Sequence, residues 1–160
     1  PREKVTTVNV GTTEEMYKAV MDNLPLADIV IKAAAPADYR PEKVADNKIK
    51  ADNVQLKLTK NPDIAAAVGK IKADKTLVAF CAETRDLIES AKKKLVSKNA
   101  DLVVANDVTK KGAGFDTDTN IASFVTKDGV ENLPLMSKAE LAGLILDKIT
   151  ELRNDSRSHS

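Results

Sequence analysis

Three short apolar runs, separated by helical patterns, constrain the fold of this chain most. The runs cover residues 28–33, 77–82 and 102–105. Continuous apolar runs of this length are typical of strands buried on both faces of a sheet. Helical spacing of apolar residues is found over residues 13–23, 64–71, 85–98 and 138–153. Alternating strands and helices predict parallel strands with helical crossovers, so we expect an α/β, Rossmann-like three-layer fold with a mostly parallel sheet.

Local signals set the expected element ends. Thr12 with Glu15 and Ser137 with Glu140 form capping-box patterns before two of the helices. The expected caps of the other two helices are Asn61, with Pro62 in the first turn, and Thr84. Residues 5–10 alternate well enough to predict a further short strand. One domain over residues 1–153 and a disordered tail over 154–160 are therefore expected.

Two segments interrupt the strand–helix pattern. Residues 43–50 are poor in apolar groups, and Val54, Leu56 and Leu58 then alternate with polar residues. This predicts a strand with one wet face, in a flap or hairpin that projects from the sheet. After a loop rich in Gly, Asp and Thr over residues 108–120, a second hairpin is expected at residues 126–129, where Asp-Gly suits a tight turn.

Composition excludes several functional classes. With 25 basic and 24 acidic residues, the chain has no bulk charge for binding nucleic acid, and no apolar run is long enough to span a membrane. The one cysteine, Cys81, cannot form an internal disulfide and is expected to be a buried thiol in a reducing, cytoplasmic setting. The one histidine, His159, lies in the polar tail, which excludes a histidine-based triad or zinc site.

The strand ends are the expected location of the chemistry. In a parallel sheet the segments 33–38, 80–84 and 106–107 meet at one edge, where α/β folds bind ligands. A helix start at residues 61–63 adds free backbone N–H groups, and lysines at 48 and 50 could meet negative charge. From residues alone this predicts a nucleotide or phosphate ligand.

Simpler interpretations of the same residues remain open at this point. Asp38 could only close a turn, and Asp63 could only complement the helix dipole. Most lysines of the segment 92–98 should be solvated, although Lys94 and Lys98 share one helix face. The chain contains no glycine fingerprint of a dinucleotide-binding dehydrogenase and no P-loop.

Five motifs in register resemble one enzyme family. They read A-A-A-P-A-D-Y-R-P at 33–41, K-I-K at 48–50, K-N-P-D-I at 60–64, V-A-F-C-A-E-T at 78–84 and A-N-D-V at 105–108. Together they resemble phosphopantothenate–cysteine ligase, the C-terminal ligase portion of a bifunctional bacterial coenzyme A biosynthesis protein. The resemblance covers nearly the whole chain, from about residue 8 to about residue 152.

The resemblance implies a cytoplasmic, CTP-dependent amide ligation. The carboxylate of 4'-phosphopantothenate would attack the α-phosphate of CTP, with Mg²⁺ on the triphosphate, and L-cysteine would then displace CMP from the acyl-cytidylate. It also implies a homodimer with the active site at the interface, the flap reaching toward the partner, and fusion to a flavin-dependent decarboxylase domain in the full-length protein.

The resemblance also implies site residues. Lys48 matches the catalytic flap lysine and would stabilise the acyl-cytidylate and its flanking transition states. The nucleotide-binding residues would be Ala34, Asp38, Lys48, Pro62, Asp63, Ile64, Ala65, Phe80, Lys94 and Lys98. Asn106 is a weaker candidate at the same edge, and the resemblance indicates no protein ligand for the metal.

The chain departs from the family pattern in three ways. The flap motif K-x-K-K is here Lys48-Ile49-Lys50-Ala51, without the last lysine. Lys32 occupies a strand position that is usually apolar or small in the family, where a buried unpaired ammonium would be costly, so a strand end or an interface is expected. The chain also starts after the family's glycine-rich strand and N-x-S-S-G-x-M-G-type segment. A truncated ligase is thus expected, and the alternative is a non-catalytic fragment that binds nucleotide and dimerises.

Overall fold

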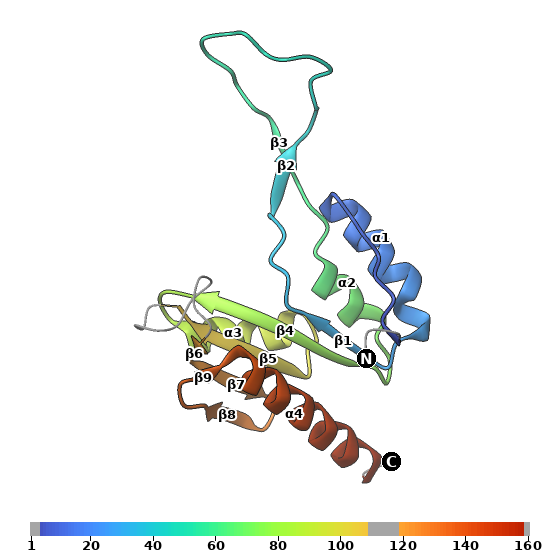
Figure 1. The fold of residues 1–160 in the computed structure, drawn as a ribbon, viewed down its shortest axis with the longest axis vertical. Coiled ribbons are helices and arrows are strands. Elements are labelled where there is room, and N and C mark those ends of the chain that lie inside the picture. The colour runs from blue at the N-terminus through green and yellow to red at the C-terminus, as the bar shows by residue number, and fades with distance from the viewer. Residues whose placement is uncertain (1–3, 109–118, 159–160) are drawn as a thin grey trace.

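A five-stranded sheet forms the centre of the protein in the computed structural model, which describes residues 4–108 and 119–158 (Figure 1). Its strands, in spatial order, are β1 (Ile29–Lys32), β4 (Thr76–Glu83), β5 (Leu102–Asp107), β7 (Ala122–Thr126) and β8 (Gly129–Asn132). β1, β4 and β5 are parallel, whereas β7 and β8 are antiparallel additions. The expected mostly parallel sheet with an attached hairpin is therefore confirmed.

Helices cover both faces of this sheet. They are α1 (Thr13–Asn23), the short 3-10 turn η2 (Leu24–Leu26), α2 (Ile64–Ile71), α3 (Leu87–Ser97) and α4 (Lys138–Ser158). Alternation along β4 divides the core, because Val78 packs with Ile145 of α4 while Ala79 packs with Ala91 of α3. Leu77 points to the α3 side and packs with Val68 of α2. The layers are therefore α4, the sheet, and the α1–α2–α3 side, as a three-layer fold requires.

The predicted helix starts are partly correct. The Thr12 and Glu15 capping box is present, with Glu15 N–H donating to the Thr12 hydroxyl at 3.1 Å. The Ser137 and Glu140 pair caps α4 in the same way. Thr84 does not cap α3, because β4 runs on to Glu83 and the chain turns through Asp86 at φ +50° before the helix begins.

The predicted hairpin after β5 is confirmed. Thr126 pairs with Gly129 across the turn, and Gly129 has φ +146°, which favours glycine. A two-residue strand β6 (Thr119–Asn120) pairs separately with β9 (Met136–Ser137). Most of the predicted loop over residues 108–120 lies outside the described residues.

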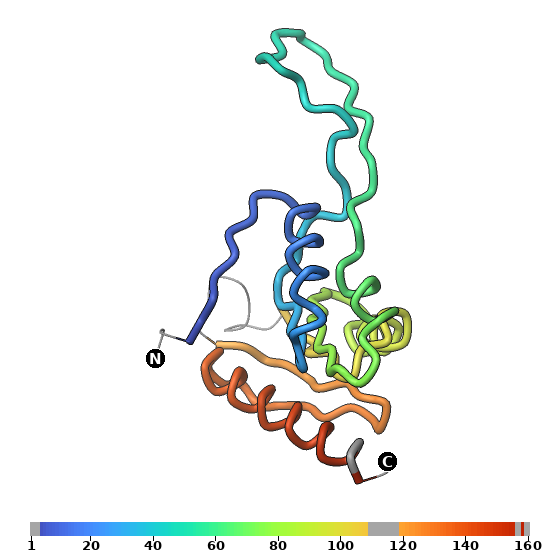
Figure 2. Tube along the Cα trace, turned by 90° about the vertical axis from the view of Figure 1, so that its right-hand side faces the viewer, coloured from blue at the N-terminus to red at the C-terminus, as the bar shows by residue number. Residues whose placement is uncertain are grey.

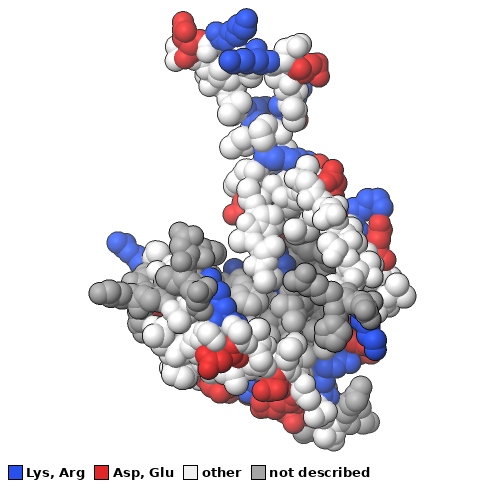
Figure 3. Space-filling view, in the orientation of Figure 1, with Lys and Arg blue, Asp and Glu red and all other residues white. Residues whose placement is uncertain are grey.

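The flap is a thin two-stranded ribbon that extends far from the body of the protein (Figures 1 and 2). Its ladder joins β2 (Tyr39–Pro41) to β3 (Leu58–Lys60), antiparallel. The predicted projecting flap is present, but its predicted strand is only partly correct. Leu58 and Thr59 enter the ladder and the Lys57 carbonyl accepts from the Glu42 N–H at 2.8 Å, whereas Val54 and Leu56 are exposed outside the described strands. Figure 3 shows both basic and acidic side chains at the far end of the flap.

Two further expectations are wrong. Residues 5–10 form no strand, because no described strand pairs with them and their valines are exposed. The tail expected to be disordered over 154–160 is helical through Ser158, whose hydroxyl donates to the Asn154 carbonyl at 3.1 Å, while residues 159–160 lie outside the described residues. That segment contains no Pro or Gly to stop the helix. No described helix is long and apolar enough to span a membrane.

Candidate functional site

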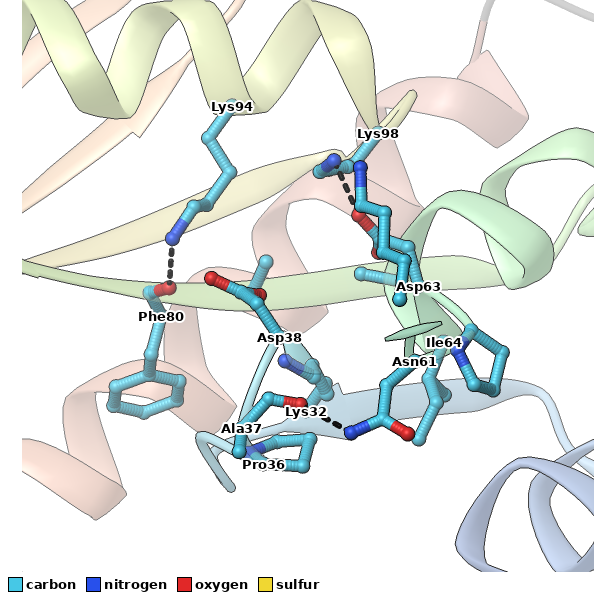
Figure 4. A pocket seen from close by; sticks show the side chains of 14 residues that line it. Lys32, Pro36, Ala37, Asp38, Asn61, Asp63, Ile64, Phe80, Lys94 and Lys98 are labelled. Atoms are coloured by element: carbon cyan, nitrogen blue, oxygen red, sulfur yellow. Dashed lines mark hydrogen bonds and ion pairs between the residues drawn. The ribbon is translucent and has the colours of Figure 1, made fainter. Parts of the chain in front are cut away.

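A cavity of about 260 Å³ opens at the carboxyl ends of β1 and β4 (Figure 4). The start of α2 and one face of α3 form its other walls. Its lining residues are Lys32, Pro36, Ala37, Asp38, Lys60, Asn61, Pro62, Asp63, Ile64, Ala65, Ala79, Phe80, Lys94 and Lys98. This is the edge at which ligands bind in open α/β sheets.

Asp63 joins two walls of this cavity. It is the N-cap of α2, and its Oδ1 accepts from the Ala66 N–H at 3.0 Å. Its Oδ2 lies 2.5 Å from the ammonium of Lys98, the C-cap residue of α3. Partial burial raises the pKa of Asp63, but the hydrogen bonds from Lys98 and Ala66 outweigh it and leave the pKa below its ordinary value. Asp63 is therefore a carboxylate at neutral pH and holds Lys98 over the cavity.

Lys94 lies one helical turn before Lys98 and reaches β4. Its ammonium donates to the carbonyl of Phe80, within the second half of that strand, at 3.0 Å. The Phe80 ring packs against the core cluster beneath α4. Phe80 therefore lines the cavity and also holds Lys94 through its carbonyl group.

Asn61 fastens the small-residue floor of the cavity to the start of α2. Its Nδ2 donates to the Ala37 carbonyl at 2.7 Å, and its backbone N–H donates to the Asp38 carbonyl at 2.7 Å. Arg40 Nη1 donates to Asn61 Oδ1 at 3.0 Å, and Arg40 also pairs with Glu14 of α1. Asn61 is thus not the predicted helix cap, a role taken by Asp63, because its side chain is used in bracing the floor.

Lys32 is the last residue of β1 and is half-buried in the cavity, which confirms the expected strand end. Burial lowers the pKa of Lys32, the Asp63 charge opposes that shift, and Lys94 reinforces it. Periodicity placed Lys32 on a strand, but gave no sign that its ammonium enters the site.

The structure gathers most of the predicted site residues. Those that line the cavity are Asp38, Pro62, Asp63, Ile64, Ala65, Phe80, Lys94 and Lys98. Ala34 instead lines an adjoining, mostly apolar cavity of about 220 Å³, which shares Lys32, Ile64 and Ala65 with the first. Lys48 is exposed on the flap and does not line the cavity.

Two other predicted features lie outside this cavity. Asn106 does not line it, and its buried Oδ1 has no hydrogen-bond partner among the residues that the structure describes. Cys81 is buried in the core beneath α3, as expected, and burial raises the pKa of its thiol. A thiol in that environment is a structural group.

The cavity suits an anionic ligand. Its lining carries four lysines and two aspartates, and the first turn of α2 supplies backbone N–H groups beside them. No group of three potential metal-ligating side chains occurs within residues 4–108 and 119–158. Mg²⁺ that is coordinated mainly by phosphate oxygens needs few protein ligands, so a metal–phosphate complex does not require such a group.

Comparisons with known proteins give a consistent result. Residues 1–152 match the family described as DNA/pantothenate metabolism flavoprotein C-terminal domain. The chain is 42% identical over 156 residues to the coenzyme A biosynthesis bifunctional protein CoaBC of Bacillus subtilis, covering 96% of this chain and 38% of that protein. It is 41% identical over 148 residues to CoaBC of Escherichia coli, covering 89% of this chain and 36% of that protein. The chain thus spans well under half of these relatives.

Solved structures agree with the sequence relatives. The crystal structure of the C-terminal domain of a CoaBC protein superposes with a TM-score of 0.79 at 38% identity, covering 96% of this chain and 68% of that one. A Cab2 variant in complex with phosphopantothenate-cysteine has a TM-score of 0.76 at 17% identity, covering 99% of this chain and 56% of that one. The second similarity shows a shared fold.

Proposed function

Because the chain belongs to the DNA/pantothenate metabolism flavoprotein C-terminal domain family, we propose that it catalyses a ligation step of coenzyme A biosynthesis. The proposed reaction joins L-cysteine to 4'-phosphopantothenate at the expense of CTP. Relatives that carry this domain are named for coenzyme A biosynthesis, and one solved neighbour of the same fold holds phosphopantothenate-cysteine. The role of these relatives and the ligand of that neighbour support the choice of substrates.

The reaction would proceed in two displacements. A carboxylate oxygen of 4'-phosphopantothenate attacks the α-phosphorus of CTP, the bond to the β-phosphate breaks, and pyrophosphate leaves. The cysteine amine then attacks the acyl carbon, the bond to the phosphate oxygen breaks, and CMP leaves while the amine loses a proton. Mg²⁺ bound to the nucleotide would neutralise phosphate charge.

One observation carries the proposal: the cations and small-residue floor of the cavity lie together at the carboxyl ends of β1 and β4. In nucleotidyl transfer, catalysis depends mainly on positioning and on stabilising negative charge. Lys94 and Lys98 are held in place by the Phe80 carbonyl and by Asp63, so their charges are already oriented toward a phosphate group. Asp38, at the edge of the floor, would accept a hydrogen bond from the ribose or the base.

Lys48 is the proposed catalytic lysine of the flap. Its ammonium would stabilise the acyl-cytidylate and the transition states before and after it. Since the flap extends away from the body of its own chain, the proposal includes a homodimer in which the flap of one copy covers the cavity of the other. Fusion to a flavin-dependent decarboxylase domain is compatible with the bifunctional names of the relatives.

The second candidate function is binding without catalysis. It is favoured by the position of Lys48, which lies outside the cavity in the single chain. In that case the chain would hold a nucleotide and form a dimer but complete no ligation.

Pyrophosphate release tests the proposal. The protein is mixed with CTP, Mg²⁺, 4'-phosphopantothenate and L-cysteine, and release is compared for the wild type, Lys48→Gln and Lys43→Gln. Lys43 is an exposed lysine of the same flap and serves as the matched control. We expect release by the wild type and Lys43→Gln, and loss of at least about 100-fold in Lys48→Gln. CTP binding without release would favour the second candidate, and a wild type that binds no CTP would refute both.

A further inference from the structure

Lys32 is a half-buried cation of the cavity whose ammonium is not used within the protein. Lys94 donates to the Phe80 carbonyl, and Lys98 is paired with Asp63. Within residues 4–108 and 119–158, the Lys32 ammonium forms no hydrogen bond or ion pair. Lys60 also lines the cavity, but it is exposed, so water can satisfy its ammonium.

An unpaired ammonium in this position is costly to the folded protein. Burial disfavours the charged form, and the nearby Lys94 and Lys98 add repulsion, against the attraction of Asp63 and Asp38. An apolar side chain of similar length would fill the same space at the end of β1 without that cost. Lys32 is therefore a residue whose charge the isolated fold does not need.

The position of Lys32 indicates what its charge could bind. Figure 4 shows its side chain among those of Asp38, Ala37 and Asn61, next to the small-residue floor. Lysine offers three donors and no acceptor. A ligand seated on residues 36–38 would therefore present an acceptor to Lys32. An anionic oxygen is the acceptor that gains most from a partly desolvated ammonium.

We propose that Lys32 is a further anion-binding residue of this site, whose ammonium donates to a phosphate oxygen of the bound nucleotide. This inference rests on the proposed function, because it takes the ligand to be a nucleoside triphosphate. It adds to Lys94 and Lys98 a third cation, which enters from the strand side of the cavity while the other two enter from α3. The phosphate chain would then be held from two directions.

Calorimetric titration with charged and neutral ligands tests the role of Lys32. The wild type, Lys32→Met, Lys32→Arg and Lys93→Met are titrated with Mg²⁺–CTP, cytidine and pyrophosphate at two salt concentrations. Methionine is similar to lysine in length but removes the charge and the N–H donors, while arginine keeps both. Lys93 is an exposed lysine of α3 outside the cavity and is the matched control.

We expect Lys32→Met to bind CTP and pyrophosphate about tenfold more weakly, with a smaller salt dependence. Its affinity for cytidine should be unchanged, and Lys32→Arg should retain most of the CTP affinity. Equal weakening for CTP and cytidine would overturn the phosphate assignment, since a neutral nucleoside has no anionic oxygen. Unchanged CTP affinity in Lys32→Met would also overturn it.

The same titrations separate this inference from the proposed function. If the wild type binds pyrophosphate but not CTP, and Lys32→Met loses pyrophosphate, then the anion-binding role stands and the choice of nucleotide falls. If CTP binds to every variant equally, the role of Lys32 falls while the proposed function stands. If no anion binds the wild type, both fall.

Discussion

Asp63 Oδ2 lies 2.5 Å from Lys98 Nζ, and this contact ties the first turn of α2 to the end of α3. The two helices are far apart in sequence, and both line the cavity. The same carboxylate also caps α2 through the Ala66 N–H. One side chain thus fixes a helix start and the position of a cation, and this double use makes it a sensitive place to test the site.

Asp63→Asn should separate the two roles of Asp63. Asparagine is a good N-cap, so the helix start should be kept while the ion pair is lost. Because the Asp63 side chain is 43% exposed, the loss in stability should be at most about 1 kcal/mol. The free energy of CTP binding should change by more than the free energy of unfolding, since Lys98 is no longer held in place. Urea unfolding and calorimetry check the two effects, and a stability loss far above 1 kcal/mol would contradict this account.

The stability difference between the wild type and Asp63→Asn should depend on pH. The folded state lowers the pKa of Asp63 from its ordinary value of 3.8, so its stabilisation is fully present above that value. The stabilisation is lost as pH falls through the lower folded-state pKa. The difference in unfolding free energy between the wild type and Asp63→Asn should therefore be constant from pH 7 to about pH 5 and shrink below pH 4. Urea titrations at pH 7, 5 and 3 measure it, with exposed Asp74→Asn as the control.

Gly69→Ala should disturb the contact between α2 and α3. A Cβ at Gly69 would lie 1.8 Å from the Lys98 carbonyl oxygen, so the backbone has to move. We expect a net loss of about 1–3 kcal/mol, even after the gain in helix propensity. Gly143→Ala in α4 is the control, since nothing lies within 4 Å of its Cβ, and it should stabilise by up to about 1 kcal/mol. Equal unfolding midpoints for the two variants would refute the packing argument.

Replacing one or the other partner of the ion pair between Lys72 and Asp101 should reduce the stability by different amounts. The Lys72 side chain is 8% exposed and that of Asp101 is 35% exposed, and Asp101 Oδ2 also accepts from the Leu77 N–H at 2.7 Å. Asp101→Asn leaves a buried ammonium without a counter-charge, whereas Lys72→Met leaves a carboxylate that water can still reach. Asp101→Asn should therefore cost more, by about 1 kcal/mol or above, in urea unfolding at pH 7. The reverse order would contradict the burial argument.

Lys32→Met should raise stability in the absence of ligand. Burial lowers the pKa of Lys32 below its ordinary value of 10.5, so the folded state bears a cost while the ammonium is charged. That cost is fully present below the folded-state pKa and is relieved as pH rises toward 10.5. Lys32→Met should exceed the wild type in melting temperature at pH 7, and the gap should narrow by pH 10. Differential scanning calorimetry measures these melting temperatures, with Lys93→Met as the control. A lower melting temperature for Lys32→Met than for the wild type at pH 7 would refute this prediction.

Periodicity predicted the layers of the fold well, because it reports which faces of each element are buried. The strands β4 and β5 could be predicted from their own apolar runs, without knowing which strands they pair with. The hairpin of β7 and β8 could be predicted from the Asp128-Gly129 turn alone. Residues 5–10 have a strand-like pattern too, but a strand needs a partner, and no described strand offers one. Pattern alone could not reveal that absence.

The sequence could indicate those parts of the candidate site that consist of residues adjacent in the chain. Residues 36–38 and the helix start at 62–65 line the same cavity, and each is a short continuous segment. The use of Asn61 as a brace was missed, since its partners Ala37 and Arg40 belong to another part of the chain. The position of Lys32 in the cavity was missed, because a single lysine at a strand end forms no sequence pattern from which it could be predicted.

The base of the flap and the floor of the cavity are built from the same residues. Asn61 bonds to the Asp38 carbonyl and is held by Arg40, directly before the ladder of Tyr39–Pro41 and Leu58–Lys60 begins. The flap is therefore anchored to the body of the protein at the cavity floor. Because the ribbon is long, a small rotation of that floor would displace the distant tip by a larger distance.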